Sequence, residues 1–194
     1  WNIKKVIPCD DSGNEFIIST KDYCCINPDY SFECDLMVLE GIDLKEGEKE
    51  DKKLIDKLIF ARKNLKGDFL DQFYIKDSDD FNEWVLFQRA RYQKKHIQSL
   101  NLLLDYYTRE GIYEDATEIL EDILRVNPYD EEACYRLMKF HIEKNDRHLA
   151  IMQYRKCYNT LRQELNISPQ KKIKQPSQQS NTGPGDYMPP QIDQ

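Results

Sequence analysis

The residue types that could carry chemistry in this chain are its cysteines, histidines and clustered carboxylates. The six cysteines form no CxxC pair, and no histidine lies at the spacing that a zinc site requires. Cys24 and Cys25 are adjacent, and neighbouring residues of a strand point to opposite faces, so a shared metal ion is sterically awkward. The pattern predicts free, buried thiols and no bound metal.

The histidines and glycines form none of the sequence motifs of catalysis or phosphate binding. His96, His141 and His148 belong to no HExxH or nucleophile motif, and the seven glycines belong to no GxGxxG, P-loop or GxSxG sequence. His141 lies 34 residues after Tyr107, at an equivalent position of a repeat, which predicts a buried, hydrogen-bonded side chain. We therefore expect no enzyme activity and no cofactor.

Two acidic clusters lie immediately before predicted helices. Residues 77–80 (DSDD) and 129–133 (YDEEA) lack the DxDxDG spacing and the distal glutamate of a calcium loop. Polar side chains at a helix start accept hydrogen bonds from free amides, and carboxylates also complement the helix dipole. The clusters, including Ser78, are predicted to cap helices.

Charge and hydropathy limit the classes to which the chain can belong. Its 194 residues are 40% hydrophobic and carry a net charge of −7. No run of about 18 apolar residues occurs, and the N-terminus has no signal-peptide pattern. The negative charge argues against a nucleic-acid coat, although the basic residues 89–96 (RARYQKKH) are a minor candidate for phosphate contact. We expect a soluble, cytoplasmic protein with no membrane partner.

The first thirty residues have a different pattern from the rest of the chain. Residues 1–7 (WNIKKVI) have the spacing of the last turns of a helix, which a proline then ends. Residues 15–20 (EFIIST) and 23–27 (YCCIN) are rich in β-branched and aromatic residues, and they predict a hairpin joined by Lys21-Asp22. No other segment is predicted to be a strand.

From residue 31 onward the apolar residues follow the period of a helix. Stripes at residues 32–39, beginning with Phe32, and at residues 54–65 each end at a glycine and predict one helix pair. Residues 78–110 contain no glycine or proline, which predicts a single helix of about thirty residues, on the order of 45 Å long. A further stripe at residues 116–124 is followed by an Asn-Pro stop.

The chain resembles itself after a shift of 34 residues, which is the period of tetratricopeptide repeats. In such repeats a tight turn needs glycine or asparagine, and a small alanine lets two helices approach closely. The predicted fold is mainly α: a tetratricopeptide-like array of about three helical hairpins with a short N-terminal β-hairpin. Most aromatic side chains are expected in the core, and the concave face is the expected binding surface. The matching pairs are Leu103 with Leu137, Leu104 with Met138, Tyr106 with Phe140, Gly111 with Asn145, Ala116 with Ala150, Leu120 with Tyr154 and Leu124 with Tyr158.

A set of motifs between residues 66 and 169 is specific when taken together. It consists of Gly67-Asp68-Phe69-Leu70, Trp84 followed by Arg89, Gly111 with Tyr113 and Ala116, Asn127-Pro128 followed by Glu131 or Glu132, Met138, Ala150 with Tyr154, and Leu161, Glu164-Leu165 and Pro169. These motifs resemble the bacterial transcriptional activator domain of SARP-type regulators. Asn145-Asp146 stands where that family usually has Gly-Arg or Gly-Asp. The repeat framework is expected to comprise Trp84, Gly111, Tyr113, Ala116, Pro128, Ala150 and Tyr154.

In that family the domain follows an OmpR-type winged-helix DNA-binding domain, and residues 1–30 resemble the C-terminal end of one. The helix end resembles the tail of the recognition helix, and the hairpin resembles the wing. The resemblance implies that Lys4 and Lys5 at the helix end, and Thr20 and Lys21 at the hairpin tip, lie near phosphate in the intact protein. Because the three-helix core is missing from these residues, we expect a fragment that binds DNA weakly or not at all.

The implied organisation is a winged-helix end at residues 1–30, a tetratricopeptide-like activator domain at residues 31–170 and a disordered tail at residues 171–194. The predicted function is that of a transcription-regulator module, with DNA bound through the intact winged helix. Its helical repeats would contact RNA polymerase, a second protomer in a homodimer, or a sensor domain. Two alternatives are a stand-alone adaptor or peptide-binding scaffold, and a small-molecule sensor, which would need a closed apolar pocket.

Overall fold

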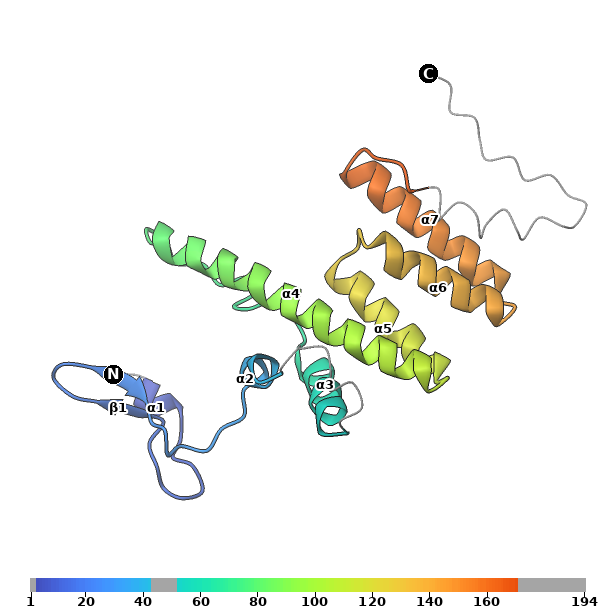
Figure 1. The fold of residues 1–194 in the computed structure, drawn as a ribbon. Coiled ribbons are helices and arrows are strands. Elements are labelled where there is room, and N and C mark those ends of the chain that lie inside the picture. The colour runs from blue at the N-terminus through green and yellow to red at the C-terminus, as the bar shows by residue number, and fades with distance from the viewer. Residues whose placement is uncertain (1–2, 43–51, 171–194) are drawn as a thin grey trace, which may run out of the picture.

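Helices make up most of the structure, in agreement with the predicted fold class. The computed structural model describes residues 3–42 and 52–170, so Trp1 and the tail expected at residues 171–194 lie outside the described residues. Figure 1 shows the elements from the N-terminus in blue to the C-terminus in red. In chain order they are α1 (Ile3–Val6), β1 (Ile17–Ser19), β2 (Cys24–Ile26), α2 (Asp35–Glu40), α3 (Lys52–Asn64), α4 (Asp79–Arg109), α5 (Tyr113–Val126), α6 (Glu131–Glu143) and α7 (Arg147–Glu164).

The predicted hairpin is present as an antiparallel pair of strands, β1 and β2, in which Ile17 pairs with Ile26. The backbone N–H of Thr20 donates to the carbonyl oxygen of Tyr23 at 2.9 Å. This hydrogen bond closes a turn at the two residues between them, as in a tight hairpin loop. The sequence therefore predicted both strands and their connection correctly.

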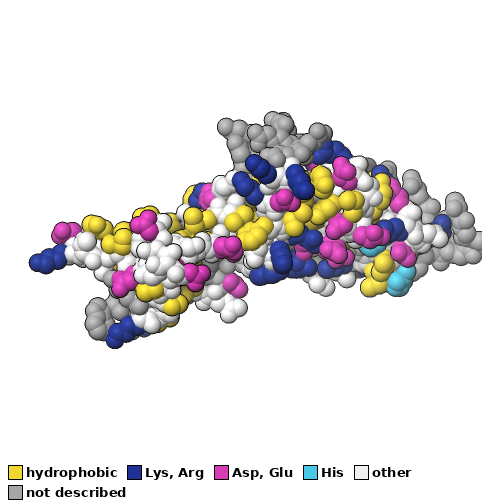
Figure 2. Space-filling model, turned by 90° about the horizontal axis from the view of Figure 1, so that it is seen from below, with side chains coloured by type: hydrophobic (Ala, Val, Ile, Leu, Met, Phe, Trp, Pro, Cys, Tyr) yellow, Lys and Arg dark blue, Asp and Glu magenta, His cyan; other side chains and the backbone are white. Residues whose placement is uncertain are grey.

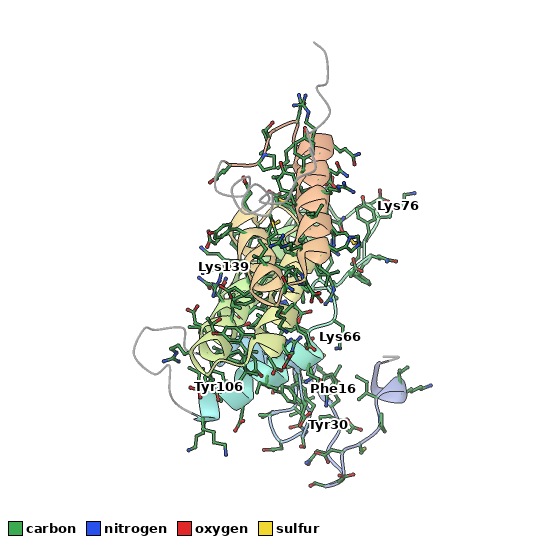
Figure 3. The ribbon with its side chains drawn as sticks, turned by 90° about the vertical axis from the view of Figure 1, so that its right-hand side faces the viewer. Phe16, Tyr30, Lys66, Lys76, Tyr106 and Lys139 are labelled. Carbon is green, nitrogen blue, oxygen red and sulfur yellow. The ribbon has the colours of Figure 1, made fainter. Side chains whose placement is uncertain are left out.

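Polar and aromatic contacts hold the hairpin to the loops on either side of it. The carboxylate of Asp10 accepts hydrogen bonds from the backbone N–H groups of Ser31 at 3.0 Å and Asn14 at 2.8 Å. These bonds lower the pKa of Asp10 to about 2, and the bond from Ser31 has the largest effect on it. The rings of Phe16 and Tyr30 meet edge to face with their centroids 5.1 Å apart (Figure 3). The loops before and after the hairpin are thereby joined to each other.

The helix predicted from the stripe at residues 32–39 is shorter than expected. Phe32 lies outside it, because its ring packs against Phe16 with a centroid separation of 5.7 Å. Cys34 is extended, with φ −135° and ψ 124°, and α2 begins at the next residue. Leu39 of α2 and Leu58 of α3 are buried in one cluster. The predicted helix pair is therefore present, but the expected helical position of Phe32 is wrong.

Helix α4 is a single helix of 31 residues, about 46 Å long, as its uninterrupted sequence predicts. Its C-terminal half buries Leu100, Leu103 and Leu104, and α5 packs against it. Its N-terminal half extends beyond α3, α5, α6 and α7 in Figure 1. No helix in the described ranges has the length and hydropathy of a membrane span.

The two expected helix caps have different outcomes. The side chain of Asp130 accepts a hydrogen bond from the backbone N–H of Ala133 at 2.9 Å, and so it caps α6 as predicted. Ser78 occupies the cap position of α4, but its side chain makes no capping hydrogen bond. Only its carbonyl oxygen joins the helix, by accepting from the N–H of Asn82 at 3.0 Å. The expected side-chain cap at Ser78 is therefore wrong.

The turns of the two predicted repeats have the same left-handed backbone conformation. Gly111 joins α4 to α5 with φ 72°, and Asn145 joins α6 to α7 with φ 65°. Glycine and asparagine adopt this conformation at lower cost than other residues, because a larger side chain crowds the backbone. The 34-residue frame is confirmed at its turns, and the Asn-Asp sequence of the second repeat retains the turn geometry.

The paired alanines lie where helices touch, since Ala116 is 0% exposed and Ala150 is 4% exposed. One apolar cluster extends from α2 to α6, and a smaller one joins α6 to α7. Burial of these side chains is the main source of stability, because it removes apolar surface from water. The smaller cluster is formed by Cys134, Met138, Cys157 and Leu161.

We predict that Gly111→Ala lowers the free energy of unfolding by about 1 kcal/mol, because alanine is strained at a left-handed position. Asn145→Gly should cost little, because glycine tolerates the same φ. Urea unfolding followed by circular dichroism measures both changes. Gly67→Ala is the matched control, since an added Cβ there meets nothing within 4 Å. Equal losses for Gly111→Ala and Gly67→Ala would contradict the assigned turn.

Candidate functional site

Four aromatic side chains form a surface feature at the projecting end of α4. Phe81, Trp84 and Phe87 recur every third residue of the helix, and Phe73 comes from the preceding segment. The ring centroids of Phe81 lie 5.6 Å from Trp84 and 6.2 Å from Phe73. Trp84 is 47% exposed, Phe87 66% and Phe73 49%. We call these four residues the aromatic stripe.

The exposure of the aromatic stripe differs from the prediction that most aromatic residues belong to the core. Trp84 does contact Phe69 edge to face, with centroids 5.7 Å apart, but about half of its surface remains open to solvent. Phe87 is more exposed still. Neighbouring exposed aromatic side chains on a helix are typical of protein-binding surfaces.

Hydrogen bonds fix the segment between α3 and α4 onto the N-terminal half of α4. The Nε of Arg89 donates to the carbonyl oxygen of Phe69 at 2.7 Å, and its Nη2 donates to that of Leu70. The side-chain amide of Asn82 donates to the carbonyl oxygen of Ile75 at 2.7 Å and accepts from its N–H at 3.1 Å. Arg89 and Asn82 of α4 thus bind backbone groups of residues that precede them by 7 to 20 positions in the sequence.

The same segment contains three side-chain-bearing residues with left-handed backbones. Leu70, Gln72 and Asp77 have φ values of 48°, 57° and 59°. Each such conformation costs on the order of 1 kcal/mol and persists only where surrounding contacts impose it. Arg89 bonds to the carbonyl oxygen of Leu70, and Asn82 bonds to Ile75 within the same segment. The segment is therefore held in a defined shape beside the aromatic stripe.

The repeat-framework residues are distributed along α4 to α7 and do not converge on one site. Tyr113 packs edge to face on Phe140 with ring centroids 5.5 Å apart. The ring centroids of Tyr154 and Tyr158 are 6.2 Å apart. Pro128 is exposed in the turn between α5 and α6. Gly111, Ala116 and Ala150 occupy the turn and close-packing positions described above. Trp84 alone among the framework residues lies on the aromatic stripe.

The expected DNA-contacting residues lie in two separate elements. Lys5 is in α1 and is exposed, whereas the side chain of Lys4 lies outside the described part of the chain. Thr20 and Lys21 are exposed at the hairpin tip. The hydroxyl oxygen of Thr20 accepts from the backbone N–H of Tyr23 at 3.3 Å, so Thr20 also stabilises the turn. Their contact with phosphate stays a prediction.

The basic stretch at residues 89–96 is used largely within the fold. Arg91 pairs with Glu40 at 2.5 Å, and Lys95 pairs with the same carboxylate at 3.0 Å. The hydrogen bond from Lys95 is the main cause that lowers the pKa of Glu40. These pairs hold α4 to the end of α2. In Figure 2, acidic and basic side chains alternate over the face shown, with no extended basic surface there.

A pocket of about 690 Å³ lies where α2, α3 and the segment after α3 meet α4 and α5. One side of it is braced by Arg62 of α3, whose Nε donates to the carboxylate of Asp122 at 2.6 Å and whose Nη2 lies 3.1 Å from Glu118. No sequence motif indicates this pocket, because its walls come from segments as much as 90 positions apart, from Leu36 to Val126. Sequence reasoning therefore missed it.

The histidines differ in their surroundings. Burial lowers the pKa of His96, and its Nε2 is buried without a hydrogen-bond partner within the described residues. Burial also lowers the pKa of His141, which is only partly buried. The expected burial of His141 is therefore wrong, and its side chain forms no hydrogen bond within residues 3–42 and 52–170. His148 is exposed in α7.

The cysteines are free but mostly not buried, contrary to the expectation. Cys134 and Cys157 are buried between α6 and α7, and Gln153 Nε2 donates to the sulfur of Cys134 at 3.7 Å. The hydrogen bond with Cys134 lowers the pKa of Cys157, while the pKa of Cys134 rises. Cys9, Cys24 and Cys25 are exposed and Cys34 is partly buried. The described ranges contain no group of three or more metal-ligating side chains.

The paired left-handed turns, the long α4 and the bracing arginine define a helical-repeat domain. A family model described as the bacterial transcriptional activator domain matches residues 37–179. The match spans more than half of the 194 residues, so the chain belongs to this family of transcription-regulator modules, which is not an enzyme family. No curated protein and no solved structure matches the chain.

We predict that Arg89→Met loosens the segment between α3 and α4, because two backbone carbonyls lose their donor. Amide hydrogen exchange should rise at residues 68–76 while the C-terminal half of α4 stays protected. Lys94→Met is the control, since this exposed α4 residue has no partner within the described residues. Unchanged exchange in the arginine variant would show that packing alone holds the segment.

Proposed function

We propose that this chain acts as the protein-binding module of a bacterial transcription regulator and that the aromatic stripe is its main contact surface. The observation that carries the proposal is the half-open Trp84 on the projecting end of α4. Membership of the bacterial transcriptional activator family supports the regulatory role. The partner is RNA polymerase, a second protomer of the regulator or a sensor domain.

The energetics of protein interfaces support the choice of this surface. Tryptophan and other large aromatic residues dominate binding energy where a partner removes them from water. Phe87 lies one helical turn after Trp84, so that a partner can cover both rings together. The segment held by Arg89 presents Phe73 in a fixed position, which limits the ordering cost of binding.

The proposed domain organisation has residues 1–30 as the end of a winged helix and residues 31–170 as the activator domain. The hairpin, its exposed tip and the preceding helix α1 support the first part. The family match begins at residue 37, close to the proposed boundary. We propose that Lys5 and Lys21, with Lys4 and Thr20, contact phosphate groups when the complete DNA-binding domain is present. Such contacts position a protein on DNA without specifying sequence.

A stand-alone adaptor that acts without DNA is the second candidate function. The paired helical hairpins favour it, because stacked hairpins serve as protein-binding scaffolds in many unrelated proteins. The two candidates differ in what precedes residue 1. An in-frame helix-turn-helix there supports the regulator, and a gene that starts without one supports the adaptor.

We predict that Trp84→Ala with Phe87→Ala lowers transcription activated by the intact regulator by about tenfold, because two interface side chains are lost. Operator binding, measured in parallel by fluorescence anisotropy, should stay unchanged. Leu149→Ala with Met152→Ala is the matched control, since both residues are exposed apolar side chains of α7. Full activation by the Trp84 and Phe87 variant would refute the assignment of the aromatic stripe.

We predict that Lys21→Glu in the intact regulator weakens binding to operator and to unrelated DNA alike, because a phosphate contact carries no sequence information. The slope of log affinity against log salt should fall by about 1. Lys57→Glu, on the exposed face of α3, controls for net charge. An unchanged salt slope for Lys21→Glu would place the hairpin tip away from DNA.

A further inference from the structure

The pocket beside α3 and α4 has the size of a ligand site. Its volume of about 690 Å³ lies within the roughly 300–1,000 Å³ typical of pockets that bind small molecules. It lies where two separate parts of the fold meet, namely the α2–α3 pair and the α4–α5 hairpin. Sites between packed elements are common positions for ligands, since each element contributes different side chains.

One wall of the pocket is apolar and aromatic. Phe69 and Tyr92 line it with ring centroids 5.5 Å apart and planes tilted by 51°, and Leu36 lies on the same lining. The rings therefore offer a surface against which a flat apolar group can pack. Aromatic contacts of this kind stabilise binding beyond the burial of area alone.

The lining has an excess of positive charge. It includes five lysine or arginine side chains and three aspartates. Two of the arginines, Arg62 of α3 and Arg125 of α5, already pair with Asp122. Lys63 and Lys66 form no ion pair or hydrogen bond within the described residues. Figure 3 shows Lys66 just beyond the end of α3. These two ammonium groups are therefore available to an anion.

His96 adds an unmet hydrogen-bonding group to the pocket lining. Its Nε2 is buried and has no partner within the parts of the chain that the structure describes. Buried polar atoms are almost always hydrogen-bonded, because an unpaired one loses its contact with water and gains nothing in return. Because this atom is closed off from solvent, a ligand could bond to it only through a shift of the surrounding side chains.

We propose that this pocket binds a small organic anion with a flat apolar body. The anionic group pairs with Lys63 and Lys66, and the body packs against Phe69 and Tyr92. Such a ligand contacts α3, α4 and the segment between them at the same time. The pocket adjoins the aromatic stripe, because Trp84 packs on Phe69 of the pocket wall, but the two surfaces are proposed to bind different partners.

The test is a titration of the purified chain with 1-anilinonaphthalene-8-sulfonate, an aromatic anion whose fluorescence rises on binding. We expect one saturable site, and the double variant Lys63→Glu with Lys66→Glu should weaken it at least about tenfold. The control Lys57→Glu with Lys156→Glu makes the same change in net charge at exposed positions outside the pocket. It should bind within about twofold of the unaltered chain. Thermal unfolding verifies that both variants are folded.

Two further arms separate the ligand chemistries and the competing surface. Benzoate should displace the probe more strongly than inorganic phosphate, because phosphate lacks the apolar body. Equal displacement by the two would overturn the assigned aromatic wall. Another outcome would also overturn the proposal: the double variant Trp84→Ala with Phe87→Ala no longer binds the probe, whereas the double lysine variant still does. The probe would then occupy the aromatic stripe. Absence of saturable binding would overturn it as well.

Discussion

The rest of the structure depends on α4 remaining one unbroken helix. Its 31 residues run from Asp79 to Arg109 without glycine or proline, so that main-chain hydrogen bonds continue along its whole length. The α2–α3 pair packs against it, α5 packs along its C-terminal half, and α6 and α7 follow from α5. Each of these elements buries too little apolar surface to be stable alone. The aromatic stripe, the pocket and the repeat turns therefore keep fixed relative positions only because one helix carries them all.

Polar contacts select among the ways in which these helices could pack. Apolar burial is strong but non-directional, whereas a hydrogen-bonded ion pair has a defined geometry. Arg62 joins α3 to α5 through Asp122, and Lys95 joins α4 to the end of α2 through Glu40. These bridges lie at the edges of the apolar cluster, where solvent screens them, and so each contributes little to stability. Their role is to fix the orientation of the α2–α3 pair, and Arg89 does the same for the segment that follows.

The features that were predicted correctly are those that depend on local patterns. The hairpin, the uninterrupted α4 and the 34-residue frame can be read from periodicity and from the residues that favour turns. The pocket and its bracing contacts could not be predicted, because Arg62 and Asp122 are 60 positions apart and share no motif. Periodicity also failed to show that Trp84 is exposed, since an apolar stripe marks a helix face without showing what covers it. Phe32 does not belong to the predicted helix, because its tertiary contact with Phe16 outweighs helical propensity.

Because α4 is one continuous helix, its N-terminal half moves as a rigid extension of the packed C-terminal half. Because α4 contains no proline or glycine at which it could kink, a rotation at its packed half is transmitted to its N-terminal half together with the segment bonded to it. Over half of its length, about 23 Å, a rotation of about 10° displaces the tip by about 4 Å. Such a displacement is comparable to the size of a side chain, and it is enough to engage or release a partner. Small adjustments where the helices meet are thus geometrically amplified at Trp84.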